Sequence, residues 1–148
     1  FEFKKGTQIM DLGTGGGFPG IPLAIFFPNV HFQLVDSISK KTNVLKDIVN
    51  ELKLDNVLVV NERAEKVNNI FDFVVTRAVA KLEKLHDWTE SKISKQDNHS
   101  FKNGLICLKG GDLNNEIKKF SNKTSIYSIS DLFEDDFFLQ KKIIHVFK

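Results

Sequence analysis

The chain has 148 residues, of which 41% are hydrophobic and 27% charged, and its formal net charge is +2. These values fit one ordinary globular domain with a buried core, and the weak positive charge permits nucleic-acid binding without indicating a dedicated binding module. No apolar stretch reaches about 18 residues, no secretory signal is visible, and the single cysteine, Cys107, excludes an internal disulfide and a cysteine-based zinc site. We therefore expect a reducing, cytoplasmic location.

Short apolar runs alternate with amphipathic stretches along the chain. The apolar runs predict strands at residues 8–12, 30–35, 57–60, 71–76, 105–108, 125–129 and 143–147. Helical spacing predicts helices at residues 19–27, 39–52, 82–93 and 113–120. Ser37 or Ser39 is expected to cap the second helix, and the polar residues 94–103 predict a surface loop.

This alternation predicts an α/β fold in which helices cover both faces of a mostly parallel sheet. The last two strands have no helix between them, so at least one is expected to be antiparallel. In such sheets ligands bind beyond the carboxyl ends of the strands, near the point where the strand order reverses. Candidate site residues are therefore those that follow each strand.

A glycine-rich loop follows the first strand, in the run DLGTGGGFPG at residues 11–20. Glycine at 13, 15 and 17 lets the backbone turn sharply and lets a ligand approach. A dinucleotide fingerprint needs a third glycine where Phe18 stands, so the spacing favours a ligand without a pyrophosphate, such as S-adenosylmethionine. The alternative is a turn that serves only the fold. A valine at Gly13 is expected to block the ligand and leave the fold intact.

Asp36 ends the second strand, 23 positions after Gly13. An acidic residue at about this distance in a strand–helix–strand unit is placed to accept hydrogen bonds from ribose hydroxyls. The alternative is a carboxylate that stabilises the start of the next helix through the helix dipole.

Residues after the third, fourth and fifth strands complete the candidate set. Ala64 and Glu65 leave room for an adenine ring beside the backbone, or form a solvated turn. Arg77 ends an apolar run and is expected to meet a carboxylate, a phosphate or the edge of a guanine, unless it forms a structural ion pair. Arg63 and Lys109 extend a positive rim that suits RNA phosphates, although isolated basic residues usually face solvent. The four histidines are scattered and predict no metal site.

Several runs together resemble a known family. DLGTGGGFPGIPLAI, VDS followed by KK, NERAE, FDFVVTRAVA and LKGG occur in this order. They resemble the ribosomal RNA small-subunit methyltransferase G family, also called glucose-inhibited division protein B, over nearly the whole chain. The resemblance implies a class I methyltransferase, that is, a Rossmann-like, mostly parallel seven-stranded sheet with helices on both faces.

The resemblance also implies the chemistry and its residues. It implies S-adenosylmethionine as cofactor, with N7 of a guanine in 16S ribosomal RNA, free or in the small ribosomal subunit, as the methyl acceptor, and neither a membrane nor a metal as partner. Carried over by position, the family's cofactor contacts fall on Gly13, Phe18, Ala64, Glu65 and Arg77. Residues 1–148 are expected to form a single methyltransferase domain without the helical segment that the family has before the first strand.

Guanine N7 carries a free lone pair and loses no proton on methylation, so no general acid or base is assigned. The enzyme is expected to act mainly by alignment of the two reactants. Two other classes stay open from the sequence: a non-catalytic RNA-binding protein that keeps a methyltransferase fold, and a nucleotide-dependent oxidoreductase, which Phe18 argues against.

Overall fold

The computed structural model describes residues 1–77 and 79–148. Its strands are β1 (Gln8–Leu12), β2 (His31–Asp36), β3 (Val57–Asn61), β4 (Phe73–Arg77), β5 (Gly104–Gly110), β6 (Thr124–Ser128) and β7 (Lys141–Phe147). Its α-helices are α1 (Gly20–Phe26), α2 (Ser39–Glu51), α3 (Leu82–Thr89) and α4 (Asn114–Ile117). Segments of 3-10 helix cover Ala64–Lys66, Glu90–Lys92, Lys118–Lys123, Ile129–Asp131 and Asp136–Phe138.

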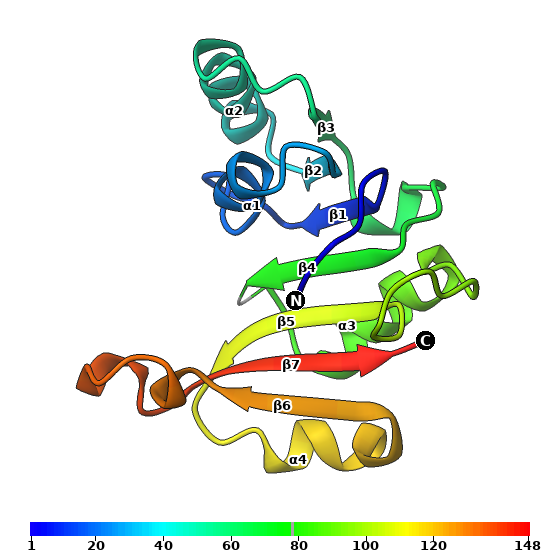
Figure 1. Cartoon of the computed structure of the whole chain (residues 1–148). Helices are drawn as coiled ribbons and strands as arrows, with labels where there is room; N and C mark the ends of the chain where they lie inside the picture. The colour runs from blue at the N-terminus through cyan, green and yellow to red at the C-terminus, as the bar shows by residue number, and fades with distance from the viewer. Residues whose placement is uncertain (78) are drawn as a thin grey trace.

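The strands of the described chain form one sheet in the order β3-β2-β1-β4-β5-β7-β6 (Figure 1). The first five strands in the chain are parallel to one another, and β7 is antiparallel to both β5 and β6. The strand order reverses between β1 and β4, which are neighbours in the sheet. The predicted α/β class and the predicted antiparallel end of the sheet are confirmed.

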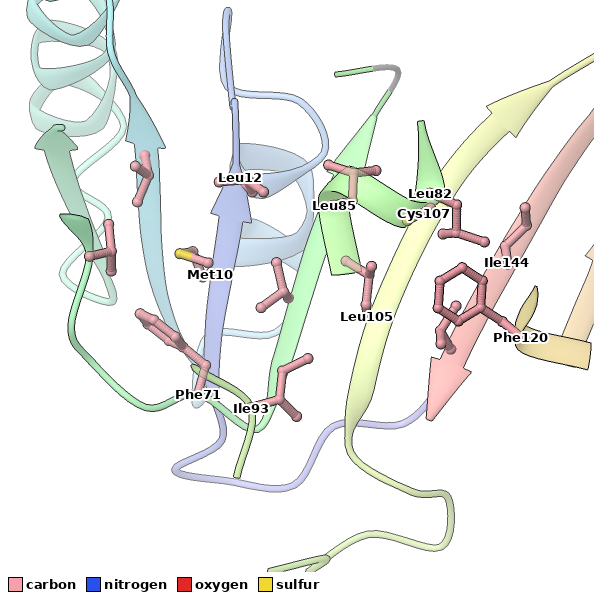
Figure 2. Packing of buried hydrophobic residues seen from close by; sticks show 14 of the residues in the cluster. Met10, Leu12, Phe71, Leu82, Leu85, Ile93, Leu105, Cys107, Phe120 and Ile144 are labelled. Atoms are coloured by element: carbon pink, nitrogen blue, oxygen red, sulfur yellow. The ribbon is translucent and has the colours of Figure 1, made fainter. Parts of the chain in front are cut away.

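Side chains of β1 alternate between two apolar layers, as the period of two in a strand requires. Ile9 packs with the layer beneath α1 and α2. Met10 and Leu12 pack with the opposite layer, which also contains Leu82 and Leu85 of α3 (Figure 2). Figure 2 shows that this second layer extends across β5 and β7 to Phe120. The central strand is therefore buried from both sides, and its carboxyl end is held rigidly.

Three local predictions are wrong in their details. Neither Ser37 nor Ser39 caps α2, because the N-cap position is occupied by Ile38, which supplies no side-chain hydrogen bond. The helix predicted at 82–93 ends at Thr89, and Ile93 leaves it to form a parallel bridge with Phe71. The α-helical part of the stretch predicted at 113–120 covers only four residues and continues as a 3-10 turn.

Candidate functional site

A cavity of about 540 Å³ opens where the strand order reverses, beyond the carboxyl ends of β1, β2 and β4. A cavity of this size suits a small ligand or a cofactor. It is lined by Leu12, Gly13, Val35, Asp36, Ser37, Ile38, Lys41, Glu62, Arg63, Ala64, Glu65, Arg77, Val79, Lys84 and Trp88. Six of the predicted site residues therefore meet around one space: Gly13, Asp36, Arg63, Ala64, Glu65 and Arg77.

Asp11 fixes the start of the glycine loop from beneath. It is fully buried, and its Oδ2 accepts hydrogen bonds from the Thr14 hydroxyl at 2.6 Å and from the Gly20 amide at 2.8 Å. A β-carbon at Gly20 would lie 2.6 Å from the same oxygen, so only glycine permits this contact. Burial raises the pKa of Asp11 to about 6 despite these two hydrogen bonds. Asp11 and Thr14 are structural residues whose role the sequence did not single out.

The three glycines predicted to bind cofactor have different surroundings. Gly13 lines the cavity and has φ at +68°. A β-carbon at this position would lie 2.5 Å from the Cγ2 atom of Val79. Gly15 has φ at +58° and donates its amide to Oδ2 of Asp36 at 3.0 Å. Gly17 faces the core, where a β-carbon would lie 2.6 Å from Ile21. Gly17 therefore serves packing, which does not favour its predicted contact with a cofactor.

The geometry at Gly13 also corrects the expected effect of a valine there. A valine would adopt a left-handed φ and overlap Val79, so it would strain the fold as well as narrow the cavity. Loss of binding in such a variant would not isolate the ligand's path.

Asp36 lies both at the cavity and at the entry to α2. Its carboxylate lines the cavity, and it also accepts hydrogen bonds from the amides of Gly15 and Ile38. The second of these contacts lies at the entry to α2, where a negative charge is favourable. Each carboxylate oxygen can accept a further hydrogen bond.

The segment after β3 forms another wall. Ala64 and Glu65 begin the 3-10 turn at Ala64–Lys66, and both line the cavity. Ala64 is half-buried against the apolar layer, whereas Arg63 and Glu65 are exposed. A small residue between two exposed charged ones leaves space for a flat ring and places polar groups at its edge.

Arg77 lies at the end of β4 and faces the same cavity. Within the described ranges, no carboxylate forms a salt bridge with it. Its guanidinium lies 5.3 Å from the centroid of the Phe18 ring, and that ring is 48% exposed beside the glycine loop. Phe18 does not line the cavity itself, but its ring lies beside Arg77, which does. The structural ion pair considered for Arg77 is therefore not found among the described residues.

Lys109 has an internal partner. Its Nζ atom lies 2.7 Å from Oε2 of Glu116, and its side chain is only 10% exposed. It does not line the cavity, so its placement does not favour the predicted contact with RNA.

Among the lining residues that the sequence did not single out, three form one wall of the cavity. Val79 lies against Gly13, and Lys84 and Trp88 approach from α3, with the Lys84 Nζ atom 4.9 Å from the Trp88 ring centroid. The spacing of four residues on a predicted helix indicated that Lys84 and Trp88 share a face. Nothing in the pattern indicated that this face meets β1.

The remaining reactive groups are structural. Cys107 is fully buried, and burial raises the pKa of its thiol to about 12, so it is a poor nucleophile. Burial lowers the pKa of His145 to about 4. In the described part of the chain, no group of three or more His, Cys, Asp or Glu side chains is arranged to hold a metal ion. No helix in that part is long and apolar enough to span a membrane.

Comparison with protein families matches residues 1–143 to rRNA small subunit methyltransferase G. The chain belongs to this family. It is 49% identical over 145 residues to the ribosomal RNA small subunit methyltransferase G of Flavobacterium johnsoniae, covering 98% of this chain and 69% of that protein. It is 50% identical over 144 residues to the protein of the same name from Bacteroides thetaiotaomicron, covering 97% of this chain and 70% of that protein.

Solved structures that resemble this family member share its fold. A precorrin-6y C5,15-methyltransferase from Geobacter metallireducens superimposes with a TM-score of 0.72 at 12% identity, covering 99% of this chain and 82% of that one. A chain of a fibrillarin/Nop5p complex superimposes with a TM-score of 0.71 at 15% identity, covering 100% of this chain and 75% of that one. The predicted class I methyltransferase fold is confirmed, and membership of a methyltransferase family decides against the oxidoreductase.

Proposed function

We propose that the chain transfers the methyl group of S-adenosylmethionine to N7 of a guanine in 16S ribosomal RNA. The observation that carries the proposal is the cavity at the strand-order reversal, which brings Gly13, Asp36 and Ala64 together opposite Arg77. Membership of the family supplies the reaction class. The proposal includes one methyltransferase domain over residues 1–148, a cytoplasmic location, and RNA as the substrate either free or within the small subunit.

The cavity fits the cofactor in size and in donor set. Its volume of about 540 Å³ lies within the range of roughly 300–1,000 Å³ that is usual for small-ligand sites. Asp36 supplies a carboxylate that would accept hydrogen bonds from the ribose hydroxyls. Ala64 and Glu65 would flank the adenine ring, and Gly13 lets the rest of the molecule approach the backbone. S-adenosylmethionine supplies a methyl group on a positively charged sulfur, which keeps the bonding electrons when the methyl leaves.

Arg77 is best assigned to the cofactor's carboxylate. A bidentate contact of its guanidinium with guanine would occupy N7 as well as O6, and N7 must be free to react. Its guanidinium has no carboxylate partner among the described side chains, and it lines the cavity. A planar guanidinium matches a carboxylate well. Phe18 lies against Arg77 and restricts the positions that this guanidinium can adopt.

The chain's contribution to the rate is alignment and not proton transfer. Guanine N7 has a free lone pair, so no side chain has to remove a proton. Rigid alignment of two reactants can lower a barrier by roughly 7–11 kcal/mol. The burial of β1 from both sides and the attachment of the glycine loop to Asp11 and Asp36 supply that rigidity. Arg63, exposed at the cavity, is proposed to contact an RNA phosphate, which would make binding weaken with salt.

Methyl transfer to two RNAs tests the proposal. The chain is incubated with S-adenosylmethionine and 16S ribosomal RNA, and the digested RNA is analysed by mass spectrometry for 7-methylguanosine. The control is the same RNA transcribed with 7-deazaguanosine, which has carbon in place of N7. We expect methylation of the first RNA only. Equal methylation of both would show that another atom accepts the methyl group.

Calorimetric titration separates the non-catalytic alternative. We expect S-adenosylhomocysteine to bind and NAD not to bind. RNA binding by a folded sample whose cavity takes neither compound would favour an RNA-binding protein that has kept the fold.

A further inference from the structure

Lys109 and Glu116 form a largely buried ion pair behind the candidate site. Lys109 lies near the end of β5 and Glu116 lies in α4, and their side chains are 10% and 26% exposed. The Nζ atom of Lys109 is 2.7 Å from Oε2 of Glu116. Neither residue lines the cavity.

Both members of the pair also contact the backbone that leads from β4 into α3. Lys109 donates a hydrogen bond to the carbonyl of Ala80 at 3.0 Å. Oε2 of Glu116 accepts a hydrogen bond from the amide of Leu82 at 2.7 Å. Leu82 is the first residue of α3, and Lys81 before it supplies no side-chain cap. Glu116 therefore caps α3 from a different element, and Lys109 holds the residue two positions earlier.

The backbone held in this way carries part of the cavity wall. Val79 adjoins Ala80, lines the cavity and lies against Gly13. Lys84 and Trp88 follow in α3 and line the cavity as well. A shift of residues 80–82 would move both parts of this wall relative to the glycine loop, which is fixed separately by Asp11 and Asp36.

We propose that Lys109 and Glu116 are positioning residues that hold Val79 and α3 at the cofactor cavity. The role rests on the proposed function, because it assigns the cavity to the cofactor. It replaces the contact with RNA that the sequence suggested for Lys109. The ammonium group acts on the reaction through the backbone at Ala80 and through Glu116.

The charge state of Glu116 agrees with this arrangement. Its partial burial alone would raise the pKa, but the hydrogen bonds from Lys109 and Leu82 and the charge of Lys109 outweigh that effect and lower it. Glu116 is therefore ionised at neutral pH. Removal of either partner would leave a charge that is largely shielded from water without its counter-ion, which is more disruptive than removal of an exposed pair.

A second ion pair between the same two regions offers a matched control. Lys119 of the 3-10 turn after α4 lies 2.6 Å from Glu83 of α3, but these side chains are 65% and 61% exposed. Neither of these side chains forms a hydrogen bond with residues 79–82 in the described structure. Lys109→Met and Lys119→Met therefore make the same chemical change to a lysine–glutamate pair. Only the first variant releases the backbone at Ala80.

Hydrogen exchange of the ligand-free protein is the first measurement, because it does not depend on any cofactor. We expect Lys109→Met to speed amide exchange in residues 79–85, with little change in the β1–β2 region, and Lys119→Met to leave residues 79–85 as in the parent chain. Lys109→Arg keeps the charge and is expected to restore most of the protection. Equal exchange in the two methionine variants would overturn the proposal.

Binding and kinetics then test the positioning role. We expect Lys109→Met to weaken S-adenosylhomocysteine binding and to lower kcat for RNA methylation by roughly tenfold to a hundredfold, with the KM for RNA and its salt dependence unchanged. A raised KM with a smaller salt dependence would show that Lys109 contacts RNA, and would overturn the proposal. Faster exchange with unchanged S-adenosylhomocysteine affinity would also overturn it.

Two further comparisons keep the outcomes distinct. If Lys109→Met does not fold, Glu116→Gln keeps an acceptor for Leu82 and removes only the charge, and a smaller change of the same kind is expected. If the parent chain binds no S-adenosylhomocysteine, the proposed function fails, and the cofactor part of this proposal fails with it. The exchange result still decides whether the pair holds the backbone.

Discussion

The amide of Gly15 donates a hydrogen bond of 3.0 Å to Oδ2 of Asp36, so the carboxylate proposed to hold the ribose also holds the glycine loop. Two walls of the cavity are thereby joined before any ligand binds. The same carboxylate receives the Ile38 amide through its other oxygen. Asp36 thus fixes the glycine loop and the start of α2 relative to each other.

Replacement of Asp36 by alanine should therefore remove more than the ribose contacts. We expect Asp36→Ala to weaken S-adenosylhomocysteine binding by about 2–3 kcal/mol, which is the scale of charge-assisted hydrogen bonds. It should also speed amide exchange at Gly15. Asp36→Asn keeps one acceptor oxygen, so its affinity for S-adenosylhomocysteine should lie between that of the parent chain and that of Asp36→Ala. Calorimetry and hydrogen exchange measure the two effects, and an unchanged affinity in Asp36→Ala would remove the ribose role.

The close approach of Gly13 and Val79 predicts a coupled pair of substitutions. Gly13→Ala should destabilise the fold by more than the roughly 1–2 kcal/mol that a left-handed φ costs a residue with a β-carbon, because its methyl group would overlap Val79. Val79→Ala should remove part of that loss when it is combined with Gly13→Ala. Denaturant unfolding of the two single variants and the double variant measures the coupling.

Gly16 is the matched control in the same loop. A β-carbon there would meet nothing within 4 Å, and its φ is not in the left-handed region. Gly16→Ala should leave stability unchanged or raise it by about 0.4–1 kcal/mol. A loss at Gly16 as large as that at Gly13 would show that the loop tolerates no side chain for another reason.

Burial of Asp11 predicts a particular dependence of stability on pH. Its pKa is about 6 in the folded chain against an ordinary value of 3.8, so the folded state keeps a proton that the unfolded state loses. The contribution of Asp11 to stability therefore falls as pH rises from about 4 to about 6. Across this window, from 3.8 to about 6, the difference corresponds to about 3 kcal/mol.

Asp11→Asn should remove this dependence. The amide oxygen can still accept from Thr14 and Gly20, and the group no longer titrates. As the pH rises from 4 to 6, the unfolding free energy of Asp11→Asn should increase relative to that of the parent chain. Urea unfolding at pH 4, 5 and 7 measures it, and a difference that stays constant with pH would contradict the raised pKa.

Arg77 can be tested with two ligands that share the adenosine and the sulfur but differ in the presence of the amino-acid part with its carboxylate. Arg77→Ala should weaken S-adenosylhomocysteine binding by roughly tenfold to a hundredfold, since a charge-assisted hydrogen bond to a carboxylate is lost. It should not change the affinity for 5′-methylthioadenosine, which lacks that carboxylate. Because Arg77 is exposed and has no described salt bridge, unfolding should change little. Equal losses for both ligands would place Arg77 elsewhere on the cofactor.

The sequence predicted the fold class and most strands because each strand is a short apolar run with a clear boundary. It also indicated Gly13, Asp36 and Arg77, since the carboxyl ends of parallel strands meet at one edge of a sheet. It could not separate Gly13 from Gly17, although both lie in the same loop. The path of the loop turns Gly13 to the cavity and Gly17 to Ile21 and Leu45, and local spacing does not encode that path.

The partner of Lys109 was equally hidden from the sequence. Glu116 lies seven residues further along the chain, beyond a turn, and the backbone atoms that the pair holds lie in a different connection altogether. Likewise, helical spacing predicted a helix to Ile93, but α3 ends at Thr89, a 3-10 turn follows it, and Ile93 pairs with Phe71. The contacts of Lys109 with Ala80 and of Ile93 with Phe71 join segments that are distant in sequence, and no local pattern specifies them.

The place of β7 in the sheet has a consequence for the order of events during synthesis. β6 is translated before β7, yet it pairs only with β7 among the described strands, and β7 separates it from β5. While residues 124–140 are emerging, β6 has no strand beside which to lie, and the edge of β5 stays open. The half of the sheet that contains the glycine loop can assemble earlier, from strands already translated. Closure of the second half therefore waits for residues 141–147, and until then the edge of β5 presents unpaired backbone N–H and C=O groups.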